Sequence, residues 1–220
     1  LFFFLICIFF YQFIYNYQRA KFLFLTVLSI YFYYKSSGFY FFLIIVSSFI
    51  DYGAGLWMER LETSFSRKTL MVASVISNFG ILGYFKYTNF FIDTANSLHL
   101  SNFHTVDIFL PVGISFFTFQ SLSYTIDVYR RELKAEKNFL DFLFFVSFFP
   151  QLVAGPIVRA ADFLPQLRKP TIVTKEDIGK AVFLIATGLF KKAVIADYIS
   201  INFVDRIFEW PTRYTGVENL

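Results

Sequence analysis

Repeated apolar segments, separated by short basic loops, constrain the fold of this chain more than any other feature. A membrane-spanning helix needs ~20 mainly apolar residues, with ~17 as the short limit, and residues 39–58 and 69–92 meet that length. Residues 1–15 and 22–34 approach it, the second with flanking lysines whose charged ends can reach the membrane interface. With a further helix over residues 108–129, we predict an all-α, multi-pass transmembrane helix bundle of about five to six spans.

The composition agrees with a membrane setting. Hydrophobic residues make up 56% of the 220 residues and charged residues 16%, whereas soluble domains average about 25% charged residues. The 34 Phe and 14 Tyr also exceed what a soluble core needs. The net charge of +4 arises from basic residues in the loops between apolar runs, as the positive-inside rule explains. We therefore expect the lipid bilayer, and no nucleic acid, as a partner.

The apolar run over residues 139–158 differs from the others because Pro150, Gly155 and Pro156 forbid an uninterrupted helix. The first, third and fifth loops between the apolar runs carry the basic residues expected on the cytoplasmic side, and residues 130–138 form the fifth. Residues 159–180 are basic as well. Both loops fit the cytoplasmic side if residues 139–158 form a re-entrant segment that turns back within the membrane, and this is the topology we predict.

Polar residues recur at three- and four-residue steps on one face of the helix that follows Pro111, which suits a first helical position. They are Gln120, Ser123, Tyr124, Asp127 and Arg131. Polar side chains in a membrane segment are costly and usually face a protein interior or a cavity.

We therefore select Gln120, Tyr124, Gln151 and Arg159 as candidates for lining a substrate tunnel, since they can bind a polar or anionic group. An equally weighted alternative is that they satisfy backbone groups freed by the prolines. Asp127 and Arg131 are interpreted as a structural i,i+4 ion pair.

Other polar residues have mainly structural interpretations. Ser47, Ser48 and Asp51 share a helix face that is expected to point inward. A second face, formed by Ala73, Ser77, Gly80 and Tyr84, has the small residues that allow close helix packing. Thr174 with Asp177 predicts a capping box at the start of a later helix, and no Cys/His spacing typical of a metal site is present.

Two motifs carry a family resemblance. Residues 119–130 (FQSLSYTIDVYR) and 147–159 (SFFPQLVAGPIVR) resemble the bacterial membrane-bound O-acyltransferase family, alginate O-acetyltransferase type. The resemblance covers residues 105–200 best. It implies that residues 1–220 are the N-terminal portion of a single membrane-embedded acyltransferase domain, truncated at both ends, in the bacterial inner membrane.

The resemblance also implies an activity, the transfer of an acetyl group to hydroxyls of an exported, alginate-like polysaccharide. The donor would be a substrate, acetyl-CoA or another activated acetyl group, with no bound cofactor. Periplasmic or surface acetylation proteins would be the partners.

In the family the catalytic histidine follows a tryptophan. Here Trp57 precedes Met58 and Trp210 precedes Pro211, and His99 and His104 lie in a polar loop. No catalytic residue is therefore assigned, and the 220 residues alone are expected to be inactive.

Two alternatives remain open at this point. A D-alanyl transfer protein for teichoic acids, from the same superfamily, shares the helix that begins at Pro111, although the PQLVAG sequence of residues 150–155 favours the acetyl branch. A non-enzymatic membrane transporter also explains a broken helix with polar residues inside the membrane. A transporter of this kind is expected to contain inverted repeats, and the sequence contains no internal repeat.

Overall fold

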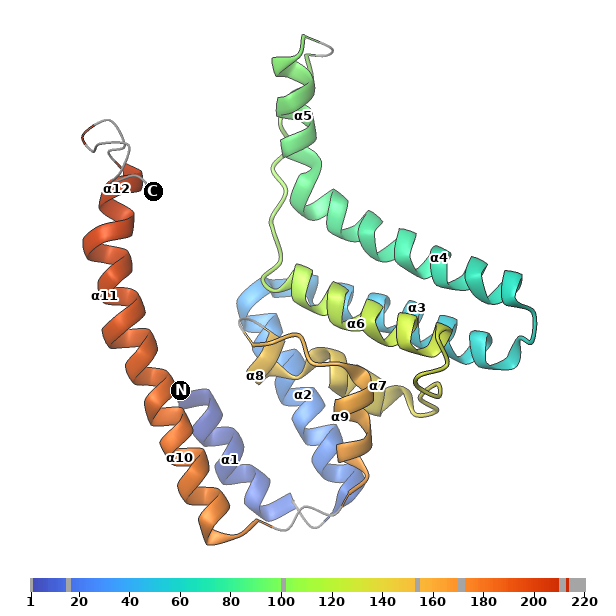
Figure 1. Cartoon of the computed structure of the whole chain (residues 1–220), viewed down its shortest axis with the longest axis vertical. Coiled ribbons are helices and arrows are strands. Elements are labelled where there is room, and N and C mark those ends of the chain that lie inside the picture. The colour runs from blue at the N-terminus through green and yellow to red at the C-terminus, as the bar shows by residue number, and fades with distance from the viewer. Residues whose placement is uncertain are drawn as a thin grey trace. The chain divides into compact units, whose positions relative to one another are not determined.

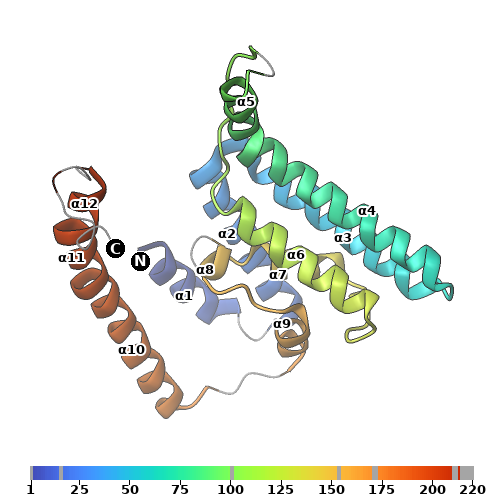
Figure 2. The ribbon, with the colours of Figure 1, turned by 45° about the horizontal axis from the view of Figure 1, so that its top comes forward.

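The computed structural model describes residues 2–14, 17–99, 102–152, 155–169, 173–209 and 213. Across these residues the secondary structure is helical without any strand, which confirms the all-α prediction. The chain divides into two compact units, residues 1–169 and 170–220, and each is described by itself. Figures 1 and 2 show the helices of both units.

The first unit contains nine α-helices among its described residues, joined by short 3-10 and π-helical turns. The α-helices are α1 Phe2–Ile14, α2 Gln18–Ser37, α3 Phe41–Arg60, α4 Ser64–Leu82, α5 Thr88–Ser97, α6 Ile114–Tyr129, α7 Phe139–Ser147, α8 Phe149–Leu152 and α9 Ala160–Leu167. A 3-10 turn, Gly38–Tyr40, joins α2 to α3, and a π-helical turn, Gly83–Tyr87, joins α4 to α5.

Helices α3, α4 and α6 pack against one another (Figures 1 and 2). Helix α7 packs on α2 and α3, and α9 packs on α6 and α7. The apolar core includes Ile44, Phe117, Tyr124, Phe142 and Phe145, each fully buried. Helix α6 is buried on most of its surface, so its polar residues face neighbouring helices and not lipid or water.

Two helical runs among the described residues are long and apolar enough to cross a membrane, Arg19–Arg60 and Ser64–Ser97. The first contains α2 and α3, and Gly38, with a φ of 59°, lies at the turn between them. Few side chains with β-carbons adopt this left-handed backbone, which explains a glycine here. The larger number of spans expected from the sequence stays a prediction.

Several helix boundaries differ from the sequence-based expectations. The helix expected from residue 108 begins at Ile114, because Gly113 has a φ of 73° and Pro111 lies in the preceding turn. The polar connection expected from residue 89 is instead helical as far as Ser97, in α5.

The prediction that the small residues of α4 and the following turn form a packing face was wrong for the described residues. Ala73, Gly80 and Tyr84 are exposed within the described chain, while Ser77 is half-buried. The buried side of α4 carries Arg67, Ser74, Asn78 and Leu82. Polar contacts with α3 and α6 therefore decided the orientation of α4, and small side chains did not.

The proline-containing segment is interrupted as predicted. Helix α7 ends at Ser147, Phe148 has a ψ of 105°, and α8 is a single short turn that contains Pro150. The chain then continues without helix from Gly155 to Arg159, where α9 begins. Helix α9 was not predicted from the sequence, since Pro165 lies inside it.

The second unit is one long helical run in its described part. It comprises α10 Lys175–Phe190, α11 Asp197–Ile199 and α12 Asp205–Glu209, with π-helical turns Lys191–Ala196 and Ser200–Val204 between them. The predicted capping box is confirmed. The Thr174 hydroxyl accepts a hydrogen bond from the Asp177 amide, and the Asp177 carboxylate accepts one from the Thr174 amide.

This cap predicts a local stability effect. Thr174→Ala is expected to destabilise the start of α10 by about 1 kcal/mol, because it removes the acceptor for a first-turn amide. Hydrogen exchange of the amides of residues 175–178 should therefore become faster. Thr187→Ala, which removes a hydroxyl bonded to the carbonyl of Phe183 within the same helix, is the control and should leave those amides unchanged.

The same cap has a pH dependence. Hydrogen bonds from the Thr174 hydroxyl and amide lower the pKa of Asp177 below its ordinary value. A lowered folded-state pKa means that the contribution is present above the unfolded pKa and is lost as pH falls through the folded pKa. Protection of the first turn should therefore decrease on acidification in the native chain and much less in Asp177→Asn.

Candidate functional site

A buried carboxyl group lies at the centre of the three-helix packing. Asp51 of α3 is fully buried, and its carboxylate accepts hydrogen bonds from Ser74, Ser121 and Asn78. Ser47 completes the cluster by donating to the side-chain oxygen of Asn78 at 2.8 Å. The inward orientation predicted for Ser47 and Asp51 is confirmed. Because an unbonded carboxylate is very costly to bury, these donors from α4 and α6 fix how the helices pack.

A buried arginine joins the ends of these helices. Arg67, in the first turn of α4, donates to the carbonyl oxygens of Met58 at 2.9 Å, Val128 at 3.0 Å and Tyr129 at 2.9 Å. The last carbonyls of a helix lack intrahelical partners and carry a partial negative charge. One guanidinium group therefore satisfies the C-terminal ends of both α3 and α6. No local sequence pattern predicts this role, because two of the three carbonyls lie 61 and 62 residues away along the chain.

Two of the tunnel candidates meet at the break after α7. The side-chain amide of Gln120 donates to the carbonyl oxygen of Phe145 at 2.6 Å, and that of Gln151 donates to the same oxygen at 3.2 Å. A continuous helix would have bonded this carbonyl to the amide of Phe149, which instead donates to Ser29. Gln120 and Gln151 thus bind a backbone group freed by the helix break, as the alternative interpretation anticipated.

Tyr124, a third candidate, is fully buried between α3 and α7. Its hydroxyl accepts a hydrogen bond from the amide of Glu136 at 3.0 Å, and its ring centroid lies 4.5 Å from that of Phe142. Helix α3 approaches closely at Gly55, where an added β-carbon would lie 2.6 Å from the Tyr124 hydroxyl oxygen. Gly55 is therefore required by this contact.

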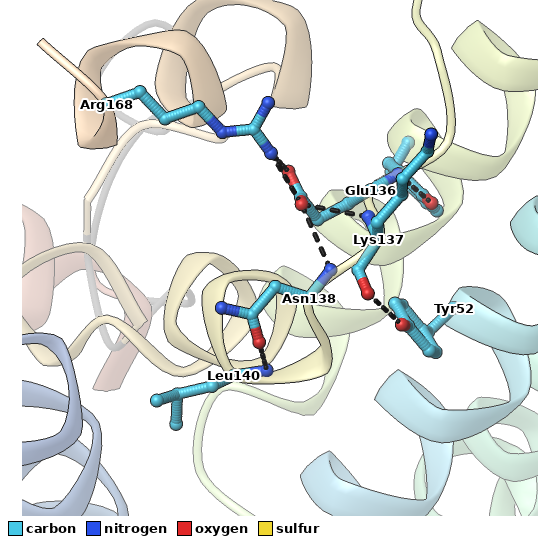
Figure 3. Close-up of polar contacts among 7 residues, drawn as sticks. Tyr52, Glu136, Lys137, Asn138, Leu140 and Arg168 are labelled. Atoms are coloured by element: carbon cyan, nitrogen blue, oxygen red, sulfur yellow. Dashed lines mark hydrogen bonds and ion pairs between the residues drawn. The ribbon is translucent and has the colours of Figure 1, made fainter. Parts of the chain in front are cut away.

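Residues 139–158, the segment predicted to turn back within the membrane, are called the hairpin below. Glu136, just before this hairpin, connects it to the residue that follows α9, Arg168 (Figure 3). It is almost fully buried, and its carboxylate accepts two hydrogen bonds from Arg168, at 2.6 and 2.7 Å. The amides of Lys137 and Asn138 donate to the same carboxylate. Figure 3 also shows Tyr52 bonded to the carbonyl of Lys137, at 2.7 Å. This cluster fixes the loop from which α7 begins.

The fourth candidate, Arg159, forms a second connection. Its guanidinium lies 2.6 Å from the Asp127 carboxylate and 3.0 Å from that of Glu132. The hydrogen bond with Asp127 is the largest cause of a raised pKa of Arg159, followed by the charge of Asp127 and the hydrogen bond with Glu132.

The expected pair of Asp127 with Arg131 is not formed among the described residues. Helix α6 ends at Tyr129, and Arg131 has a φ of 63°, which takes it off the helix surface. An i,i+4 pair requires a continuous helix over both residues. The partner of Asp127 is Arg159 instead, 32 residues further along the chain.

Together these contacts hold the residues that follow α8 beside the end of α6 and the loop after it. Residues 130–138 precede α7, and Arg159 and Arg168 follow α8, yet both arginines pair with carboxylates at the end of α6 or in the loop after it. The neighbourhood agrees with the hairpin expected from the basic loops. Its placement in a membrane and on the cytoplasmic side stays a prediction.

Two hollows with charged walls lie at this end of the unit. One, of about 300 Å³, is lined by Glu59, Glu62, Arg67, Arg131 and Lys134 among others. The other, of about 310 Å³, lies at the junction of the N-terminal parts of α2 and α7 with α9, and Arg19, Asp141 and Arg168 are in its wall. Polar ligands with negative groups would find both charge and hydrogen-bond donors here.

The histidines do not contribute to these clusters. His99 and His104 are both exposed, His99 two residues after the end of α5 and His104 in the loop that follows. Within the described part of the chain, no group of three His, Cys, Asp or Glu residues is arranged to hold a metal ion.

The sequence is similar to those of several named bacterial proteins. The peptidoglycan O-acetyltransferase of Helicobacter pylori is 32% identical over 222 residues, which cover 89% of this chain and 42% of the relative. Proteins named "Probable alginate O-acetylase AlgI" from Pseudomonas syringae pv. tomato and Pseudomonas putida are 36% and 34% identical over 205 residues, or 90% of this chain. Over most of its length the chain is therefore similar to proteins named as O-acetyltransferases or O-acetylases, in keeping with the family resemblance of its two motifs.

The match spans most of this chain and less than half of each of these relatives, 39% and 42% of the two Pseudomonas proteins. No family model matches the chain. No solved structure matches it significantly either. The two family motifs in the sequence are the segments that the structure joins, since residues 119–130 contain Gln120, Tyr124 and Asp127, and residues 147–159 contain Gln151 and Arg159.

The close approach at Gly55 predicts a selective packing defect. Gly55→Ala should destabilise the unit by about 1–3 kcal/mol, the usual cost of overpacking a core. Gly53→Ala is the matched control, because its β-carbon would meet no atom within 4 Å. Thermal unfolding of the purified protein in detergent should separate the two variants, and equal stability would contradict the Tyr124 contact.

The Glu136 cluster predicts a second defect. Glu136→Gln should destabilise the hairpin by about 2 kcal/mol, because it weakens charge-assisted hydrogen bonds to a buried acceptor. Glu132→Gln, at a half-exposed carboxylate of the same loop, should have a much smaller effect. Limited proteolysis between residues 130 and 169 would measure this difference, with faster cleavage expected in Glu136→Gln alone.

Proposed function

We propose that this chain forms part of a membrane-bound O-acyltransferase that transfers an acetyl group to hydroxyls of an exported polysaccharide. The observation that carries the proposal is 32–36% identity, over about nine-tenths of the chain, to proteins named as O-acetyltransferases or O-acetylases. The acceptor is an alginate-like polymer or peptidoglycan, the two substrates that those names print. The site of action is the bacterial inner membrane, with several spans of the chain in the bilayer.

The packing supports a passage through the protein near the broken segment. Ser48, Thr118 and Ser147 are buried hydroxyls without a partner among the described residues, and they lie on α3, α6 and α7, which pack on one another. Buried polar groups left without protein partners are commonly satisfied by water or ligand. We propose that Gln120, Tyr124 and Gln151 form a wall of this passage while also holding the backbone, with Arg159 at its charged end.

The acetyl donor in this proposal is acetyl-CoA or another activated acetyl group, which approaches from the cytoplasmic side. The hollows have walls of mixed charge, in which Arg131 and Lys134 of one and Arg19 of the other could contact an anionic donor beside Glu59, Glu62 and Asp141. The acceptor polysaccharide and its acetylation partner proteins lie on the opposite side of the membrane. Neither exposed histidine is the base that deprotonates the acceptor hydroxyl, and we place that base outside residues 1–220.

Genetic complementation tests this proposal. Deletion of the complete gene should abolish base-labile acetyl esters on the exported polysaccharide, and the wild-type gene should restore them. The double variant His99→Ala/His104→Ala should restore them to within about twofold of wild type, since removal of a catalytic base costs at least 10²-fold. Loss of activity in the double variant, in protein that still folds, would place the base in this loop instead.

The same strains distinguish the alternative functions. Acetate released from alginate-like polymer and from peptidoglycan is measured separately, so the acceptor is identified by which pool falls. Loss of D-alanyl esters with unchanged acetate would favour a D-alanyl transfer protein. Unchanged esters with altered solute uptake would favour a transporter and refute the acyl-transfer proposal.

A further inference from the structure

An apolar groove runs along the outside of α3 and α4. It consists of two adjoining hollows of about 450 and 550 Å³, which share Trp57 and Leu70 in their walls. Gly53, Ala54 and Ala73 line the inner hollow and leave space between the helices. The outer hollow ends at the turn between the helices, where Arg60 and Phe65 line it.

The length of the groove matches one half of a bilayer. Its lining residues on α3 extend from Phe49 to Arg60, which at 1.5 Å per residue is about 17 Å. The hydrocarbon core of a bilayer is about 30 Å thick, so the groove covers about one leaflet. Trp57 is 62% exposed and Phe65 82% exposed near its outer end, as is common for aromatic side chains at a membrane interface.

Charge is separated at the outer end of the groove. Arg60 is exposed and forms no ion pair with another described residue, and it faces the apolar hollow. The neighbouring acidic residues, Glu59 and Glu62, line a different hollow together with Arg131 and Lys134. A single uncompensated cation therefore stands at the end of an apolar channel one leaflet long.

We propose that this groove binds an anionic membrane phospholipid, with an acyl chain between α3 and α4 and the phosphate at Arg60. An apolar channel that ends in a cation fits the two parts of such a lipid, its acyl chain and its phosphate, whereas a purely apolar helix would leave Arg60 without an anionic partner. The hydroxyl of Ser66, which lines the outer hollow, adds a hydrogen-bonding group for the phosphate. This site is separate from the proposed acetyl-transfer passage and does not depend on it.

Photo-crosslinking of the complete protein in vesicles tests the proposal. Phe65 is replaced by p-benzoylphenylalanine, which has a similar ring and lies in the outer hollow. The vesicles contain phosphatidylethanolamine with either phosphatidylglycerol or phosphatidylcholine as the second lipid. After illumination, the mass of the adduct identifies the occupant. The expected adduct is phosphatidylglycerol, in preference to phosphatidylcholine.

Matched variants then test each part of the groove. Arg60→Gln should reduce the phosphatidylglycerol adduct about fivefold, as expected for one basic side chain near an anionic lipid. Gly53→Leu should reduce it by filling the inner hollow, since its side chain would extend into open space. Lys68→Gln, exposed but outside the groove lining, and Gly80→Leu, at an exposed glycine of α4, should leave the adduct unchanged.

Four results would overturn the proposal. They are a cross-link to another segment of the same chain, a cross-link to a second copy, equal labelling by both lipids, and equal labelling in Arg60→Gln and wild type. If Gly53→Leu does not fold, the exposed Arg60 variant still decides the outcome. Acetyl-ester content is measured on the same strains, so that a failure of lipid binding is distinguished from a failure of acetyl transfer.

Discussion

Burying a polar group in an apolar helix bundle is costly unless the group finds a hydrogen-bond partner, and the main contacts between the helices of the first unit satisfy that constraint. The carbonyl of Phe145 loses its helical partner where the chain breaks after α7, and two glutamine side chains bind it. One carbonyl near the end of α3 and the last two carbonyls of α6 are bound by the single guanidinium of Arg67. Long polar side chains therefore replace the water that would solvate such groups in a soluble protein.

The same constraint explains how the hairpin is held. A segment that enters and leaves at one end of a bundle has two loops side by side, and like charges in those loops would repel. Asp127 and Glu136 are buried at this end and pair with Arg159 and Arg168, which remain largely exposed. Each pair keeps one partner in contact with solvent, which lowers the desolvation penalty of a fully buried ion pair. The hairpin is thus anchored by these two ion pairs as well as by apolar contacts.

These contacts also indicate how structure and the proposed activity are related. Three residues of the two motifs, Gln120, Gln151 and Arg159, fix the path of the backbone around the break after α7. In the proposed passage the same residues form part of the wall. Structural and functional interpretations of the motifs are therefore compatible. A motif residue can be required for the proposed acetyl transfer without contacting the substrate.

The sequence by itself determined the all-α class, the interruption at Pro150 and Pro156, the inward face of Asp51 and the cap at Thr174, because each follows from local periodicity or backbone stereochemistry. Only the tertiary structure decided which residues pair. Asp127 binds Arg159 and not its neighbour Arg131, and Arg67 reaches carbonyls 61 and 62 residues away. The buried side of α4 was likewise set by contacts to Asp51 and not by its small residues. Such partners come together only when helices distant in sequence pack, and no local pattern encodes the packing.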